Sequence, residues 1–74
     1  HHVIGRRYLM YGQRIKKLRK DNGLTQEGLA YMTGLSSTAI SAWEHEVNEP
    51  SLGALIKLAN YFKVSIDYIA GRKG

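Results

Sequence analysis

The chain has 74 residues, which is enough for one small domain and too few for two. It contains no cysteine, so disulfide bonds and cysteine-metal sites are excluded and apolar packing has to stabilise the fold. No apolar run approaches the roughly 18 residues of a membrane span. The composition therefore predicts a single domain that contacts no membrane and works in a reducing, cytoplasmic setting.

The net charge of +5 and the isoelectric point of about 9.8 favour a polyanionic partner such as nucleic acid. The charge is unevenly distributed, because no Lys or Arg occurs between Lys20 and Lys57. That stretch instead carries the carboxylates of Asp21, Glu27, Glu44, Glu46 and Glu49. Any contact between the middle of the chain and nucleic acid must therefore be made with few cations.

Both ends of the chain are expected to lie outside the folded domain. His1 and His2 look like the remnant of a purification tag, and Met10 would then be the natural start. We therefore expect a tag or disordered arm over 1–9, the folded domain over 10–71, and a tail over 72–74.

The first helix is predicted from Tyr11 to Lys20. Tyr11, Ile15 and Leu18 recur at i, i+4 and i+7, so they share one face, and the basic residues lie elsewhere. Gly23 suits the left-handed conformation that commonly follows a helix C-terminus. The pattern indicates an amphipathic helix with a solvated basic side.

The second and third helices are predicted to be short. Thr25 reads as the N-cap of the second helix and Gly34 as its end, with Leu29, Ala30 and Met32 supplying the apolar side. Either Ser36 or Ser37 caps the third helix. Its inward-facing side chains are three residues apart, at Ile40 and Trp43.

The fourth and fifth helices are predicted to begin after Ser51 and Ser65, and Gly71 ends the fifth. The fourth helix carries a broad apolar stripe of Leu52, Leu55, Ile56, Leu58, Ala59 and Phe62. With no convincing strand, the pattern predicts an all-α fold, a compact five-helix orthogonal bundle.

The most informative segment is TQEGLAYMTGLSSTAISAWE, residues 25–44. Two short helices joined by a Gly-containing turn can cross at about 90–120°, as in a helix-turn-helix. Ala30 is small where the helices must approach closely, and Gly34 stands where the turn favours positive φ. These choices agree with one another and predict a helix-turn-helix.

The chain resembles the Cro/repressor (Xre-like) helix-turn-helix family over roughly residues 11–71. The matching segments, in order, are IKKLR (15–19), LTQ (24–26), LA (29–30), GLS (34–36), ISAWE (40–44), EPSL (49–52) and VSIDYI (64–69). The resemblance implies a lambda-repressor-like DNA-binding domain and a transcriptional regulator, most readily a repressor, that binds double-stranded DNA in a sequence-specific way.

In this family a recognition helix, here about 36–45, inserts its N-terminal end into the major groove. Ser37, Thr38 and Ala42 match the usual base-reading positions. Hydroxyl groups can pair with more than one base, and the methyl groups of Thr38 and Ala42 suit a thymine methyl. The resemblance therefore assigns base contacts to these three residues.

Phosphate contacts are expected around the recognition helix. Gln26 matches the family's phosphate-binding glutamine, and the backbone N–H groups at a helix N-terminus favour an anion there and after Ser51. Lys16 and Lys20 would supply positive charge. The full expected set is Gln26, Ser36, Ser41, Ser51, Lys16 and Lys20.

Arg19 and Glu44 match a family pair that forms a partly buried salt bridge, so Glu44 is interpreted as structural. The chain departs from the family directly after it, where His45-Glu46 replaces a Gly, Asn or basic residue. We expect Glu46 to adopt a left-handed conformation at some strain.

The sequence predicts no enzyme, cofactor or metal site, since it has no phosphate-binding Gly-rich loop or nucleophile motif and His45 has no evident metal partner. The expected form is a homodimer on a pseudo-palindromic operator, with recognition helices about 34–36 Å apart. Tyr61, Ile66, Tyr68 and Ile69 are candidates for the dimer contact or for the domain's own core. The alternative is an antitoxin or other protein-interaction module that binds a partner protein and for which DNA binding is secondary.

Overall fold

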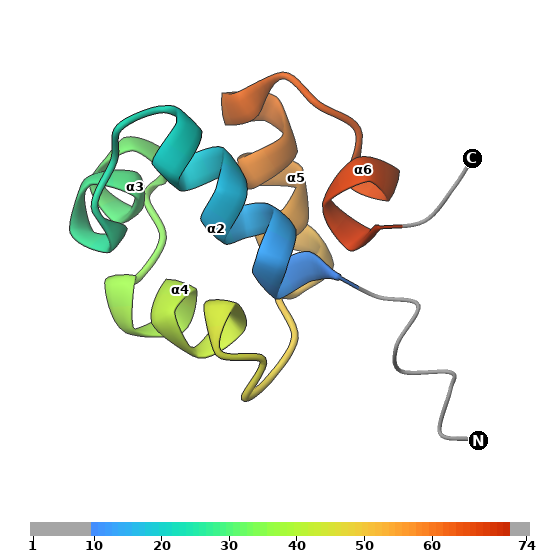
Figure 1. Cartoon of the computed structure of the whole chain (residues 1–74), viewed down its shortest axis with the longest axis horizontal. Coiled ribbons are helices and arrows are strands. Elements are labelled where there is room, and N and C mark those ends of the chain that lie inside the picture. The colour runs from blue at the N-terminus through green and yellow to red at the C-terminus, as the bar shows by residue number, and fades with distance from the viewer. Residues whose placement is uncertain (1–9, 72–74) are drawn as a thin grey trace.

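A computed structural model of the protein describes residues 10–71, and the expected tag over 1–9 and tail over 72–74 lie outside the described residues. The described part contains helices and no strand (Figure 1). The helices are α2 (Tyr11–Asp21), α3 (Gln26–Thr33), α4 (Ser37–Glu44), α5 (Leu52–Phe62) and α6 (Ile66–Ala70). The predicted all-α fold is confirmed, and α2 is one residue longer than expected.

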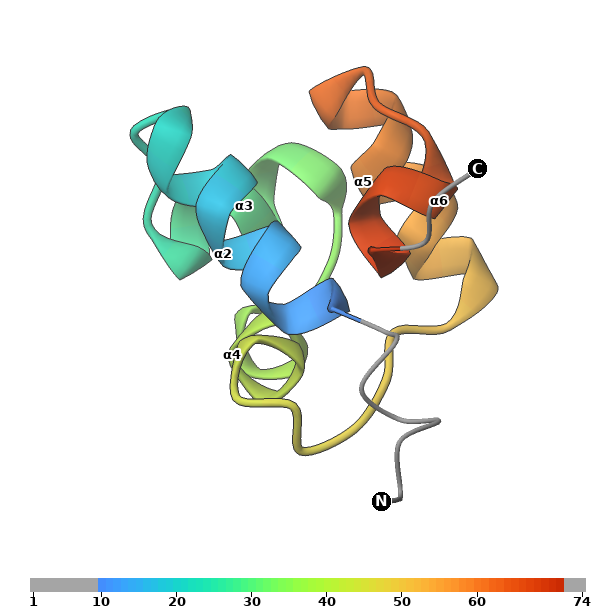
Figure 2. The same ribbon diagram turned by 45° about the vertical axis from the view of Figure 1, so that its right-hand side comes forward.

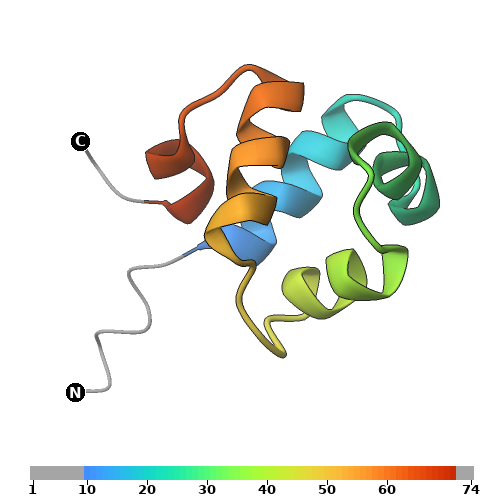
Figure 3. The same cartoon turned by 180° about the vertical axis from the view of Figure 1, so that it is seen from behind.

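The helices pack around one small core. Helix α2 contacts both α4 and α6, while α3 packs on α4 and α5 (Figures 1 and 2). Seen from behind, α5 crosses the back of α2 and leads into α6 (Figure 3). Each helix contributes one fully buried side chain to the centre, in chain order Ile15, Leu29, Ile40, Leu58 and Ile69.

Four of the helices begin at a hydroxyl N-cap. The side chains of Thr25, Ser36, Ser51 and Ser65 each accept a hydrogen bond from the backbone N–H three residues later, at 2.9–3.2 Å. Each such cap stabilises a helix by about 1 kcal/mol. The predicted caps are confirmed, and the choice left open for the third helix falls on Ser36.

Within residues 10–71, two residues other than glycine adopt a left-handed backbone, and both lie just past a helix. Glu46 has φ 58° and Lys63 has φ 59°. The strain expected at Glu46 is therefore present, and it costs a non-Gly residue about 1–2 kcal/mol. Gly34, with φ 74°, closes α3 as predicted.

Helices α2 and α4 approach closely at Gly12. A Cβ atom added there would lie 2.5 Å from the Trp43 carbonyl oxygen and 2.8 Å from Cγ of Glu46. A glycine is therefore required at this position, because any side chain would force the two helices apart.

The N-terminal end of α2 is also joined to α6. The Met10 N–H donates to the Ala70 carbonyl at 2.8 Å, and Arg14 donates to the Tyr68 carbonyl at 3.0 Å while lying 4.4 Å from the centre of the Tyr68 ring. These contacts join the first and last described helices.

The structure corrects some of the expected uses of apolar residues. Ile69 is fully buried and belongs to the core, so it is not available for a dimer contact. Leu52 and Ile56 of the α5 stripe, and Met32 of α3, are exposed instead of buried. The reason is geometric, since α5 packs mainly against α3 and α6 and its stripe is wider than the surface that those helices cover.

Candidate nucleic-acid interface

Helices α3 and α4 form the predicted helix-turn-helix. The turn is closed by Gly34 and Leu35, whose N–H groups both donate to the Ala30 carbonyl, at 2.8 and 3.1 Å. Ala30 itself is buried where the two helices meet. In Figure 2, α4 is seen nearly end-on below α2 and α3, so its outer side is free of other helices.

An open hollow lies between the start of α3 and the outer side of α4. Its lining residues are Thr25, Gln26, Glu27, Ser37, Thr38, Ser41, Ala42, His45 and Val47. Most of these side chains are polar, and no Lys or Arg is among them. Recognition through this hollow must therefore rely on hydroxyl, amide and imidazole groups.

All three residues that the resemblance assigns to base contacts lie in this hollow. Thr38 is exposed, and Ser37 and Ala42 are half-buried on the same side of α4. Because Ser36 caps the helix, the Ser37 hydroxyl is not needed as a cap and faces the hollow.

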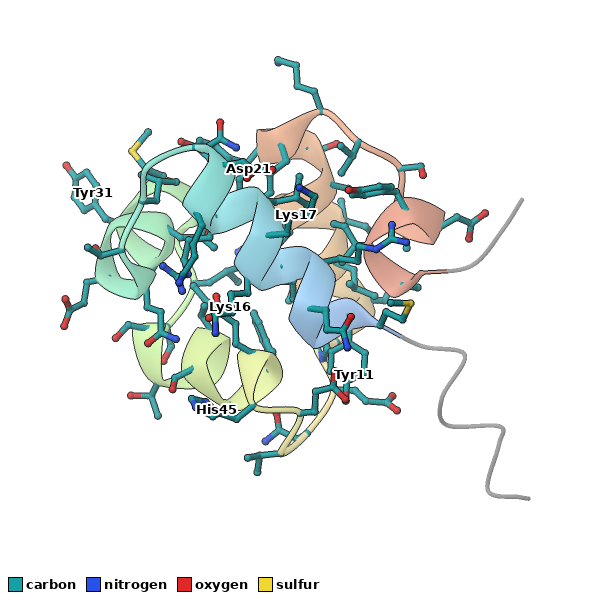
Figure 4. All side chains as sticks on the ribbon, in the orientation of Figure 1. Tyr11, Lys16, Lys17, Asp21, Tyr31 and His45 are labelled. Carbon is teal, nitrogen blue, oxygen red and sulfur yellow. The ribbon has the colours of Figure 1, made fainter. Side chains whose placement is uncertain are left out.

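The residues expected to contact phosphate are split between two places. Gln26 and Ser41 line the hollow. Four others lie outside its lining: Ser36 and Ser51 as exposed caps, and Lys16 and Lys20 as exposed side chains of α2. Figure 4 shows Lys16 on the side of α2 that faces α4.

The ion pair predicted between Arg19 and Glu44 is present. Arg19 donates from Nε to Oε2 of Glu44 at 2.7 Å and from Nη2 to Oε1 at 3.0 Å, a two-pronged contact. The two side chains are only 10% and 3% exposed. Arg19 also donates to the Leu24 carbonyl at 2.8 Å, so one guanidinium joins α2, α4 and the segment before α3.

Gln26 is attached to this ion pair. Its Nε2 donates to Oε1 of Glu44 at 3.1 Å, so the buried carboxylate orients a side chain at the edge of the hollow. Burial alone would raise the pKa of Glu44, but the hydrogen bonds from Arg19 and Gln26, with the charges of Arg19 and Lys16, hold it below 4.5. Glu44 is therefore a charged structural anchor whose partners all lie toward α2 and α3.

Sequence reasoning did not assign His45, Val47, Thr25 or Glu27 to the hollow. The signal for His45 is its spacing. Ser41 and Ala42 lie three and four residues after Thr38, and His45 lies four and three residues after them, so these residues share one face of α4. The contribution of Val47 comes from the turn after α4, which helical spacing does not predict.

No group of three or more His, Asp or Glu side chains within residues 10–71 is placed to hold a metal ion. In the same part of the chain, every helix is too short or too polar to cross a bilayer.

Residues 15–69 match the helix-turn-helix family HTH_3. The chain is 42% identical over 62 residues to the HTH-type transcriptional regulator YobD of Bacillus subtilis, covering 84% of this chain and 55% of YobD. The P22 c2 repressor, solved with a synthetic operator, is 36% identical with a TM-score of 0.78, over 84% of this chain and 96% of that one. Bacillus subtilis SinR, solved with DNA, is 33% identical with a TM-score of 0.76, over 81% and 97% of the two chains.

The chain spans about half the length of the curated relatives that it matches. The matched segment runs from α2 to α6 and includes the α3–α4 unit, the buried ion pair and all five central core residues. The chain belongs to the helix-turn-helix family of Xre and Cro/repressor type.

Proposed function

We propose that this chain is the DNA-binding domain of a transcriptional regulator, with α4 as the recognition helix in the major groove. The observation that carries the proposal is the hollow beside α4, where Ser37, Thr38 and Ala42 are presented together on the free side of the helix-turn-helix. The similarity to the P22 c2 repressor and to SinR, both solved with DNA, supports it. Binding to chromosomal DNA would place the activity in the cytoplasm.

Base reading and phosphate binding are divided between the two helices in this proposal. The hydroxyl and methyl groups of α4 read base edges, and Gln26, at the start of α3, binds a phosphate. The contact with Glu44 uses one N–H of the Gln26 amide, which leaves its second N–H free to donate to a phosphate oxygen. Ser36, Ser41, Ser51, Lys16 and Lys20 complete the proposed phosphate contacts.

The working form in this proposal is a homodimer on a pseudo-palindromic site, and a repressor is the favoured type of regulator. Tyr61, Ile66 and Tyr68 are half-buried and remain candidates for the contact between subunits. Two copies would place their recognition helices about 34–36 Å apart, one turn of the DNA helix. Sedimentation of the DNA complex tests this form, because a single protein chain on a saturated site would contradict it.

A second candidate is a domain that mainly binds another protein. Tyr31 of α3 is 87% exposed and points away from the body of the molecule (Figure 4), and Val47 is 73% exposed. Among the structural neighbours, SinR was solved in complex with SinI, at 33% identity to this chain and a TM-score of 0.76. This alternative covers an antitoxin, for which DNA binding is secondary.

Selection from random duplex DNA at about 0.15 M salt, with excess competitor, separates the two candidates. An enriched motif with two-fold symmetry is the expected result and identifies the half-site. Retained DNA with no enriched motif, together with a protein that copurifies stoichiometrically, would instead favour the protein-binding domain.

A further inference from the structure

His45 carries the only imidazole among the side chains that line the hollow. Imidazole is the side-chain group that proteins use to change charge near neutral pH. It follows the last residue of α4 and is exposed, and Figure 4 shows it on the side of α4 away from α2. Since the lining contains no Lys or Arg, the imidazole is the only group there that can supply positive charge.

The orientation of the ring is fixed by a hydrogen bond. His45 Nδ1 lies 2.9 Å from the Ser41 carbonyl oxygen, which also accepts the His45 backbone N–H at 3.0 Å. A carbonyl oxygen only accepts, so Nδ1 carries a hydrogen in both charge states of the ring. The charge change therefore takes place at Nε2.

The two states of Nε2 present opposite chemistry to an anion. In the neutral ring Nε2 is a lone pair, which repels a phosphate oxygen, and in the imidazolium it is an N–H that donates to one. His45 is seven residues beyond Thr38, or about 10 Å along the helix. A major groove is about 12 Å wide, so a side chain this far from the inserted end meets the groove edge, where the phosphates lie.

The charged groups near His45 come from α3, from α4 and from the turn after α4. Glu27 of α3 lines the same hollow, and Glu46 and Glu49 follow in the next turn. Glu44 faces the other way, toward Arg19 and Lys16 of α2. The remaining lining residues are uncharged, and the Glu46 side chain lies toward α2, where its Cγ would be 2.8 Å from a Cβ atom added at Gly12.

We propose that His45 binds a DNA phosphate and makes DNA affinity depend on pH. Its Nε2 donates a hydrogen bond to a phosphate oxygen when the ring is protonated and cannot do so when the ring is neutral. This inference rests on the proposed function and adds to it a contact and its control by pH. It also accounts for how the hollow, whose lining contains no Lys or Arg, gains a cation.

The test measures the affinity for labelled duplex at pH 6 and pH 8 at constant ionic strength, using the selected site and a mixed-sequence duplex. We expect about three- to tenfold tighter binding at pH 6. A phosphate contact that favours the protonated ring over the neutral one by up to about tenfold tightens DNA binding by up to the same factor when the ring is protonated. A phosphate contact carries no sequence information, so both duplexes should show the same ratio. The salt dependence should steepen at pH 6 by about 0.9 in log–log slope.

Two variants of His45 and one control assign the effect to this ring. His45→Gln should bind weakly at both pH values, and His45→Arg should bind tightly at both. His1 and His2 also titrate in this range, so the double variant His1→Gln/His2→Gln is the matched control and should keep the full pH dependence.

A wild-type affinity that is the same at both pH values, or a pH dependence that persists in His45→Gln, would overturn the inference and leave the proposed function intact. If neither duplex is bound at any pH, the proposed function itself fails and the inference fails with it.

Discussion

Replacing Glu44 by alanine should destabilise the fold strongly, because it breaks the buried ion pair with Arg19. The substitution leaves the Arg19 guanidinium, part of a residue only 8% exposed, with the Leu24 carbonyl as its remaining partner. Breaking a buried pair on one side typically costs about 3–5 kcal/mol. A domain of this size has a total stability of roughly 3–9 kcal/mol, so Glu44→Ala should be close to unfolded at 37 °C.

The assay is urea denaturation at pH 7, followed by the fluorescence of Trp43. This is the single tryptophan of the chain, 6% exposed in the folded state, so its emission reports unfolding directly. The chain also offers a matched control in the exposed pair Lys17–Asp21, whose side chains are 62% and 58% exposed. Asp21→Ala should cost no more than about 0.5 kcal/mol.

The reasoning is refuted if Glu44→Ala costs less than about 1 kcal/mol, or no more than Asp21→Ala. A double variant that replaces both Arg19 and Glu44 by apolar residues separates loss of the pair from an unpaired buried charge. It should be more stable than Glu44→Ala alone, because no uncompensated charge remains.

Three further predictions concern acid, packing and recognition. The pKa of Glu44 is lower in the folded state than its usual 4.5, so the stability that its charge contributes is complete above pH 4.5 and is lost as the pH falls through the folded pKa. Measuring the urea midpoint at decreasing pH should show this loss of stability, and Glu44→Gln should make the loss smaller. Gly12→Ala should destabilise the fold by about 1–3 kcal/mol, because its Cβ would lie 2.5 Å from the Trp43 carbonyl oxygen. In the same urea denaturation, Gly53→Ala should be neutral or stabilising by up to about 1 kcal/mol, because its Cβ would meet nothing closer than 3.9 Å. Thr38→Ala should change the preferred base at one position while Gln26→Ala weakens binding to all sequences alike, and identical behaviour of the two in the DNA selection would contradict the division into base and phosphate contacts.

The sequence predicted those features that depend on a few neighbouring residues. Thr25, Ser51 and Ser65 were identifiable as caps because a hydroxyl directly before an amphipathic segment satisfies a free N–H of the first turn. The strain at Glu46 was also predictable, since the family pattern favours glycine or asparagine near that turn and this chain has a residue with a Cβ atom.

The remainder depends on contacts between residues that are distant in sequence. The hydrogen bond from Gln26 to Glu44 spans 18 positions, and the close approach at Gly12 involves residues more than 30 positions away. The exposure of Leu52 and Ile56 depends on how much of α5 its neighbours cover, which hydrophobic spacing alone does not determine. For these reasons the sequence could propose Gln26, Ser37 and Thr38, which the structure places in the hollow, but it could not predict the contacts that hold them there.

The hydrogen bond between the Met10 N–H and the Ala70 carbonyl has a consequence for chain connectivity. It places the two ends of the described fold side by side, so a few glycines would be enough to join them. New ends could then be opened at Gly23, an exposed residue whose Cβ position has no neighbour within 4 Å. Such a circular permutant would keep α3, the turn and α4 as one uninterrupted segment, and it would show whether the order in which the helices are connected matters to the fold or only their packing.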